Sequence, residues 1–340
     1  MNFKEVIKSK EYDFIRTNEH LGDNIILLGV GGSYSYGMNI EGKSDIDIRG
    51  IALNKKSEIL TKKNFETFEE KDTDTVIHSF MKTVKMLEDL NPNLVEIFGL
   101  KPEHYLYIHP IGQEFIDNID IFLSQKCAYS FGNYAKDQLR RLLNKSNRTA
   151  TQTEQEQHIL NSIMGASKTF PEKFFTYDSD AIKLYLDDAV SEDFDKEIFM
   201  DINLKHYPLR DYKAMWSEMN NIVKEYAKIG RRNQNAIAHD KLGKHMAHVI
   251  RLYYMCFDIL EKEEIITYRE NEHELLMDLR NGKYLDENRQ PIPEFYEMVN
   301  ELEKRLEYAK EHTFLPDKPD YNAIDEFVMS VNERVVKGIV

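Results

Sequence analysis

Residues 24–53 read NIILLGVGGSYSYGMNIEGKSDIDIRGIAL. The run Asn24–Val30 is apolar and ends in glycines, which is typical of a buried strand. Residues 45–53 begin with alternating polar and apolar positions, so they predict a second strand. Between the two runs, Gly31-Gly32-Ser33 predicts a turn from the first strand into a short helix. A small α/β domain at the start of the chain is the expected result.

The glycine turn is a candidate phosphate site. A strand that ends in Gly-Gly-Ser and turns into a helix leaves backbone N–H groups and a hydroxyl free, and glycine lets an anion approach the backbone closely. We therefore expect Gly32 and Ser33 to contact phosphate. An ordinary strand-to-helix turn contains similar glycines, so the interpretation depends on the carboxylates that follow.

Asp45 and Asp47 alternate with apolar Ile46 and Ile48, so both carboxylates should point to one face of the strand. Like charges at such positions repel each other unless a divalent cation neutralises them. Mg²⁺ binds few carboxylates together with substrate phosphates, and two such ions stabilise the attacking and leaving oxygens of a displacement at phosphorus. The residues predict two Mg²⁺ ions, an NTP donor and nucleotidyl transfer.

The motifs resemble those of the DNA polymerase beta-like nucleotidyltransferase superfamily. Within it, the chain is similar to a predicted nucleotidyltransferase family that includes bacterial proteins encoded beside RNA ligases. The residues that carry the resemblance are Gly32-Ser33, Tyr36-Gly37, Ser44-Asp45-x-Asp47-x-Arg49-Gly50 and Asn91-Pro92-Asn93-x-x-Glu96, and, in the second half, Lys244-His245-x-x-His248-x-x-Arg251-Leu252, Leu279-Arg280-Asn281-Gly282 and Leu315-Pro316. The resemblance spans nearly the whole chain.

The resemblance implies that Gly32 and Ser33 hold the triphosphate and that Asp45 and Asp47 bind metal. It also implies a third carboxylate on a later strand. We expect Asp74 in that role, because its segment has strand character and a neighbouring strand would bring it beside the first pair. The expected catalytic and metal-binding set is thus Asp45, Asp47 and Asp74, and the alternatives for the third carboxylate are Glu70, Asp72 and Glu96.

Other polar residues have two interpretations each. Arg49 would either steer the triphosphate or form an ion pair with Asp47. His245, His248 and Arg251 recur at three-residue spacing along one face of a predicted helix, and Lys244 is expected to join them. Lys244, His248 and Arg251 would bind the nucleotide there, or the face would serve packing and capping. The histidine spacing does not match the usual zinc-protease pattern, so a zinc site is not expected.

The predicted fold class is α+β, with a small mixed-sheet nucleotidyltransferase domain over residues 1–124 and a mostly helical domain over residues 125–340 that completes the cleft. The acidic segment Thr176–Tyr207 is expected to be surface loop and short elements. Weaker strands are expected over 65–68 and 73–78. Helical periodicity predicts helices over 79–90, 94–100, 111–119, 126–144, 154–168, 212–229 and 241–262.

The composition limits the possible partners. The chain has 340 residues, 41% of them hydrophobic, and a net charge of −14, so no overall field attracts nucleic acid or an anionic membrane. Residues 247–260, the most apolar later stretch, are too short and too charged to span a bilayer. The N-terminus shows no apolar signal region, and Cys127 and Cys256 form no paired motif, so we expect a cytoplasmic protein.

Two further functions compete with nucleotidyl transfer. One is a nucleotide-binding regulatory module, similar to an antitoxin, that does not turn over. The other is RNA cleavage by the helical half, because Arg232-Asn233 followed by His239 superficially resembles the motif of HEPN ribonucleases. The sequence leaves open the acceptor, which would be an RNA end, a protein or a small molecule, as well as the base preference and the oligomeric state.

Overall fold

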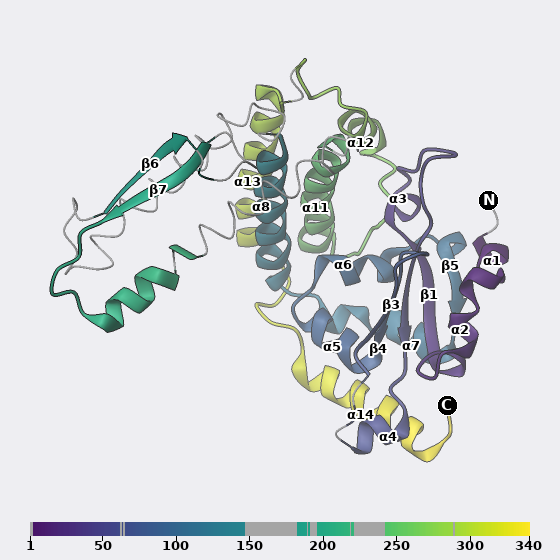
Figure 1. Cartoon of the computed structure of the whole chain (residues 1–340). Helices are drawn as coiled ribbons and strands as arrows, with labels where there is room; N and C mark the ends of the chain where they lie inside the picture. The colour runs from purple at the N-terminus through teal and green to yellow at the C-terminus, as the bar shows by residue number, and fades with distance from the viewer. Residues whose placement is uncertain are drawn as a thin grey trace. The chain divides into compact units, whose positions relative to one another are not determined.

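The computed structural model describes residues 3–61, 63, 65–146, 182–188, 190, 196–217, 219–220, 242–287 and 290–340. The chain divides into two compact units, which we call the first and the second unit. The first comprises Met1–Leu139, Lys244–Lys283 and Pro293–Val340; the second comprises Arg140–Gly243 and Tyr284–Ile292. Figure 1 shows the chain coloured from its N-terminus to its C-terminus. The predicted helix over 154–168 lies outside the described residues.

A five-stranded sheet forms the centre of the first unit, with strand order β3-β4-β2-β1-β5. Strand β2 pairs with β4 in parallel, whereas the other neighbours are antiparallel, so the sheet is mixed as predicted. Every residue of β1 is buried, as its apolar sequence indicated. The strands are β1 (Ile25–Gly31), β2 (Asp47–Ala52), β3 (Thr67–Glu70), β4 (Thr75–Ser79) and β5 (Tyr105–Ile108).

Aromatic side chains connect the sheet to its helices. Phe80 begins helix α5 (Phe80–Glu88), and its ring lies 5.4 Å from that of Phe115 on α7 (Pro110–Asp117). Phe115 in turn lies 5.2 Å from Phe327 on α14 (Tyr321–Lys337). The last helix of the chain therefore closes the core of the N-terminal sheet. The short helices of this unit are α1 (Phe3–Val6), α2 (Phe14–Thr17), α3 (Gly32–Ser35), α4 (Lys56–Leu60) and α6 (Pro92–Val95).

The remaining long helices are α8 (Lys126–Ser146), α11 (Leu242–Lys262), α12 (His273–Arg280) and α13 (Pro293–His312). Helices α8 and α11 confirm predictions, whereas α12, α13 and α14 were not predicted. In α11 nearly every residue from Met246 to Leu260 is buried, and Tyr253 donates a hydrogen bond to Glu303 of α13 at 3.3 Å. The predicted α+β class is confirmed. Within the described ranges, no helix has the length and apolar content needed to cross a membrane.

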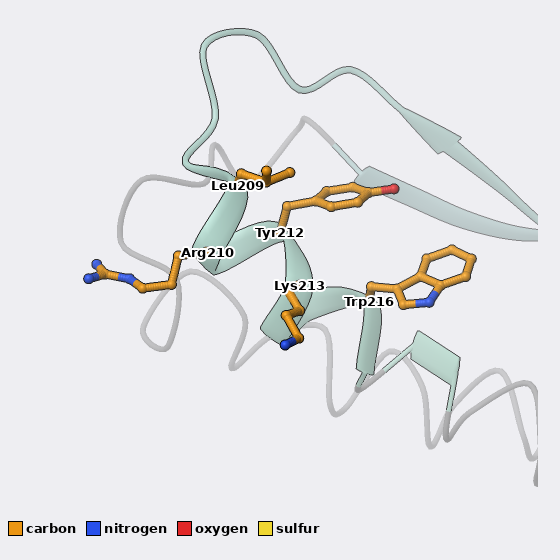
Figure 2. A pocket seen from close by; sticks show the side chains of 5 residues that line it. All are labelled: Leu209, Arg210, Tyr212, Lys213 and Trp216. Atoms are coloured by element: carbon orange, nitrogen blue, oxygen red, sulfur yellow. The ribbon is translucent and has the colours of Figure 1, made fainter.

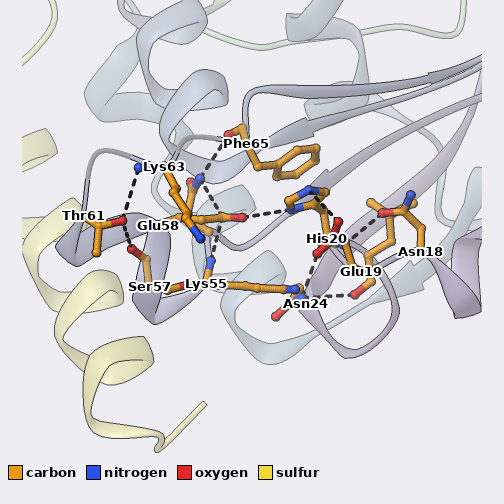
Figure 3. A network of polar contacts seen from close by, with 12 residues as sticks. Asn18, Glu19, His20, Asn24, Lys55, Ser57, Glu58, Thr61, Lys63 and Phe65 are labelled. Atoms are coloured by element: carbon orange, nitrogen blue, oxygen red, sulfur yellow. Dashed lines mark hydrogen bonds and ion pairs between the residues drawn. The ribbon is translucent and has the colours of Figure 1, made fainter.

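A polar network holds the segment before β1 against α4 (Figure 3). The His20 ring contacts Glu58 at 2.9 Å and stacks on Phe65 with 4.6 Å between the ring centroids. Glu58 also accepts a hydrogen bond from the backbone N–H of Lys55 at 2.9 Å, which caps α4. These contacts fix the loops at one end of β1 and β2, so the opposite ends of the strands are left for the candidate site.

The second unit contains an antiparallel hairpin of β6 (Ile182–Asp188) and β7 (Lys196–Ile202). The prediction of loop for 176–207 is therefore wrong over these strands. Its acidic residues suggested a solvated loop, but a strand accepts acidic side chains where they face solvent, and Asp187 is exposed. After the hairpin, residues 209–217 are helical and bury Met215.

Candidate active site

Two of the predicted carboxylates meet where parallel strands begin. Asp47 is the first residue of β2, and Asp74 is the last residue of the turn before β4. Ile48 pairs with Thr75 across the two strands, so the residues directly before them, Asp47 and Asp74, also lie side by side. The Ile48 N–H donates a hydrogen bond to the Asp74 carbonyl at 3.3 Å. Their side chains lie close enough for each to shift the pKa of the other, and both lie within 4.0 Å of Arg49. The structure thus places Asp74 beside Asp47.

The two carboxyl groups influence each other's ionisation. Burial raises the pKa of Asp47 to about 7, and the hydrogen bond with Asp74 adds to this increase. The same hydrogen bond is the main reason why the pKa of Asp74 lies below its usual value. Two close carboxylates do not ionise together readily in the absence of a cation, so one of them keeps a proton.

Arg49 lies beside this pair. Its Nη1 donates to the Asp74 carbonyl at 2.6 Å, and its Nη2 lies 3.4 Å from Asp74 Oδ1 and 4.0 Å from Asp47 Oδ1. The guanidinium lowers the pKa of both carboxyl groups, which opposes the effect of burial. Of the two interpretations of Arg49, the structure shows the ion pair, and Asp74 is the closer partner.

The glycine turn presses against Asp47. Gly31 pairs with Asp47 across β1 and β2, and Gly32 follows with φ +59°, a conformation that favours glycine. A Cβ atom on Gly32 would lie 1.4 Å from Asp47 Oδ2. Ser33 comes next in α3 and is 8% exposed. Gly32 is therefore required both by its backbone angle and by the carboxylate that occupies the space of a side chain.

Asp45 stands apart from the pair. It is exposed in the segment before β2, and its carboxylate has no hydrogen bond or ion pair with any residue that the structure describes. Within these same residues, no group of three His, Cys, Asp or Glu side chains is arranged to hold a metal ion. The catalytic and metal-binding roles of Asp45, Asp47 and Asp74 therefore stay predictions. Of the alternatives, Asp72 is exposed in the turn and Glu70 ends β3.

Two residues of the predicted polar face on α11 differ in environment. Lys244 is exposed in the first turn, and its charge is among the smaller causes that lower the pKa of Asp47 and Asp74. His248 is half-buried, and its Nδ1 lies 2.9 Å from Arg251 Nη2. Burial is the main cause that lowers the pKa of His248 to about 3, and the charge of Arg251 is the next largest cause. This histidine is therefore neutral at physiological pH. Nucleotide binding by both residues stays a prediction.

Arg251 is 1% exposed and already has partners. It forms an ion pair with Glu96 at 2.8 Å, and its guanidinium lies 3.5 Å above the centroid of the Tyr36 ring. The Tyr36 hydroxyl donates to Glu96, and burial raises its pKa. Sequence reasoning missed this network, although Tyr36, Glu96 and Arg251 all belong to the motifs that carried the family resemblance. Nucleotide binding by Arg251 stays a prediction.

A hollow of about 500 Å³ lies elsewhere, on the second unit (Figure 2). It is lined by Leu209, Arg210, Tyr212, Lys213 and Trp216. None of the predicted site residues belongs to it. The HEPN-like residues Arg232, Asn233 and His239 lie outside the described part of the chain.

The family comparison agrees with the N-terminal motifs. Residues 4–168 match the model of the RNA repair pathway DNA polymerase beta family, and this span contains the glycine turn and the three predicted aspartates. Searches of curated proteins and of solved structures returned no match. The match over residues 4–168 confirms the resemblance to a family of DNA polymerase beta-like nucleotidyltransferases that the motifs predicted.

Proposed function

We propose that the protein is a Mg²⁺-dependent nucleotidyltransferase that moves an NMP from an NTP to a hydroxyl or phosphate acceptor and releases pyrophosphate. The observation that carries the proposal is the proximity of Asp47 and Asp74, with the Asp47 carboxylate packed against the glycine turn. The family description names an RNA repair pathway, so an RNA end is the first acceptor to test. A protein and a small molecule are the other candidates.

The residues at this place fit a divalent cation. Carboxylate oxygens are the ligands that Mg²⁺ prefers, and the raised pKa of Asp47 beside Asp74 reflects a repulsion that a cation would relieve. Asp47 and Asp74 would hold the ion, with Asp45 as the third ligand. When bound there, Mg²⁺ would neutralise phosphate charge and lower the pKa of the acceptor hydroxyl.

The protein residues have separate tasks in this proposal. The backbone of Gly32 and the hydroxyl of Ser33 bind the triphosphate. Arg49 holds the Asp74 carboxylate, which orients the acceptor hydroxyl and takes its proton. The acceptor oxygen then bonds to the α-phosphorus while the bond between the α-phosphorus and its bridging oxygen breaks, and pyrophosphate leaves.

The helical part contributes to the same proposal. Lys244, His248 and Arg251 remain the nucleotide-binding candidates on α11. The division into a catalytic domain of residues 1–124 and a helical domain of residues 125–340 stays a prediction. Residues 244–283, which include α12 and nearly all of α11, fall in the predicted helical domain, yet they belong to the same compact unit as the five-stranded sheet.

Label transfer tests the proposal. The full chain is incubated with each α-labelled NTP and Mg²⁺, with RNA carrying defined hydroxyl or phosphate ends, with protein extract, or with small-molecule pools. We expect transfer to one acceptor class, and loss of transfer in Asp47→Asn and Asp74→Asn. Asp72→Asn is the matched variant, because it removes a neighbouring carboxylate from the same turn; we expect it to retain activity. Unchanged turnover in Asp47→Asn would refute the assignment.

A second candidate is a nucleotide-binding module without turnover. It is favoured by the separation of Asp45 from the Asp47–Asp74 pair within the described residues. This candidate predicts NTP binding that depends on Mg²⁺ and no label transfer to any acceptor. Binding measured in parallel with transfer therefore distinguishes the two functions.

A further inference from the structure

Arg280, the last residue of α12, contacts the loop that leads into the predicted metal site. Its Nη2 donates a hydrogen bond to Ser44 Oγ at 3.4 Å, and Ser44 directly precedes Asp45. The two residues are 236 positions apart in the chain, so the fold brings Arg280 to this loop. The same hydroxyl accepts a hydrogen bond from the Ile40 N–H at 2.8 Å, so Ser44 is held by its own loop without Arg280.

The charge of Arg280 is not neutralised. Every other buried or half-buried arginine whose side chain the structure describes forms an ion pair with a carboxylate: Arg49, Arg251, Arg269 and Arg334. Arg280 is half-buried and has no such partner among the described residues. Removal from water is the one cause that lowers its pKa, and no acidic group counteracts it. A partly desolvated cation without a counterion is unfavourable unless a ligand supplies the negative charge.

We propose that Arg280 binds a phosphate group of the donor nucleotide. The inference rests on the proposed function, since it needs a triphosphate beside Asp45 and Asp47. A triphosphate brings several negative charges to a place that already holds carboxylates, so it requires cations that are not already paired. Arg49 and Arg251 are engaged with carboxylates, whereas Arg280 is available. Its planar guanidinium suits phosphate oxygens, to which it donates two parallel hydrogen bonds.

A purely structural role makes the opposite predictions. A cation in the last turn also complements the helix dipole, and the contact with Ser44 would stabilise the loop. If these effects dominated, removal of the guanidinium would lower the melting temperature. If Arg280 serves a ligand, Arg280→Met keeps the aliphatic length, removes an unpaired charge, and leaves the melting temperature unchanged or higher.

The test is NTP affinity by calorimetry with Mg²⁺ on the full chain, together with thermal unfolding with and without inorganic tripolyphosphate. We expect Arg280→Met to weaken NTP binding on the order of 10- to 100-fold, because a charge-assisted contact is lost. Arg280→Lys should retain part of the affinity. Tripolyphosphate should raise the melting temperature of the wild type more than that of Arg280→Met. Arg334→Met is the control, since it removes a half-buried arginine that is paired with Glu114; it should lower stability and leave NTP affinity unchanged.

The outcomes separate this inference from the proposed function. Wild-type affinity in Arg280→Met overturns the role of Arg280 and leaves the proposed function intact. Weakened binding together with a lower melting temperature and no recovery in Arg280→Lys assigns Arg280 to loop structure and also overturns the inference. A wild-type chain that binds none of the four NTPs overturns both proposals.

Discussion

Gly32→Ala tests the contact between the glycine turn and Asp47. The backbone of Gly32 has φ +59°, where an alanine is strained by about 1–2 kcal/mol. The added Cβ would also overlap Asp47 Oδ2, at 1.4 Å, and Asp47 Cγ, at 2.6 Å. The carboxylate must rotate away, which changes its position relative to Asp74. We expect a modest loss in the free energy of unfolding, of about 1–2 kcal/mol, and a large loss of Mg²⁺-dependent NTP binding.

Gly42→Ala provides the matched control. Gly42 has φ +73°, but a Cβ there meets no atom within 4 Å. The variant therefore has a similar backbone penalty without the clash with Asp47. Urea unfolding should show similar losses for Gly32→Ala and Gly42→Ala, whereas calorimetry with NTP and Mg²⁺ should show weakened binding in Gly32→Ala alone. Wild-type binding by Gly32→Ala, or equal weakening in both variants, would refute the reasoning.

Three further predictions concern the core, the carboxyl pair and the second unit. Glu96→Gln leaves the buried Arg251 without its counterion, so urea titrations should show a free energy of unfolding lowered by about 3–5 kcal/mol. A loss below about 1 kcal/mol would argue against a buried ion pair. Without metal, folded Asp47 keeps its proton up to about pH 7, whereas the unfolded chain releases it at about pH 4. The free energy of unfolding should therefore fall as pH rises through this window, and Asp47→Asn should remove that slope. A wild-type free energy of unfolding that is flat over this window contradicts the proximity of the two carboxyl groups. The lowered pKa of Asp74 has the opposite effect: at pH values below its usual carboxyl pKa, it makes the free energy of unfolding rise with pH. Trp216 is the only tryptophan and is 56% exposed, so acrylamide should quench the intrinsic fluorescence of the native protein readily; emission protected from the quencher would contradict the exposed position.

The sequence predicted the elements whose periodicity is strong. Strand β1 and helix α11 are long, regular and largely apolar, so local patterns sufficed for both. The hairpin of β6 and β7 was missed because acidic residues obscured its alternation. Helix α14 was missed although it carries clear signals, since Asp320 caps its start and Gly338 ends it in the left-handed conformation.

The sequence predicted the candidate site only where its residues lie close together along the chain. The glycine turn and Asp47 lie within one motif, so their proximity follows from the spacing of two strands. The position of Asp74 depends on the parallel pairing of β2 with β4, which no local pattern determines. The contact of Arg280 with Ser44 depends on where α12 packs, so a sequence without its fold does not reveal it.

The glycine turn depends on residues far beyond the family match. Tyr36, which ends the short helix after this turn, lies under the guanidinium of Arg251, and its carbonyl accepts a hydrogen bond from the Arg269 N–H at 3.2 Å. A Cβ on the neighbouring Gly37 would lie 2.6 Å from the ring of Tyr268, so this ring packs directly on the turn. All three supporting residues follow residue 168, where the match ends. The span that carries the aspartates therefore lacks part of the contacts that hold its own glycine turn in place, and residues after the match belong to the structure of the site.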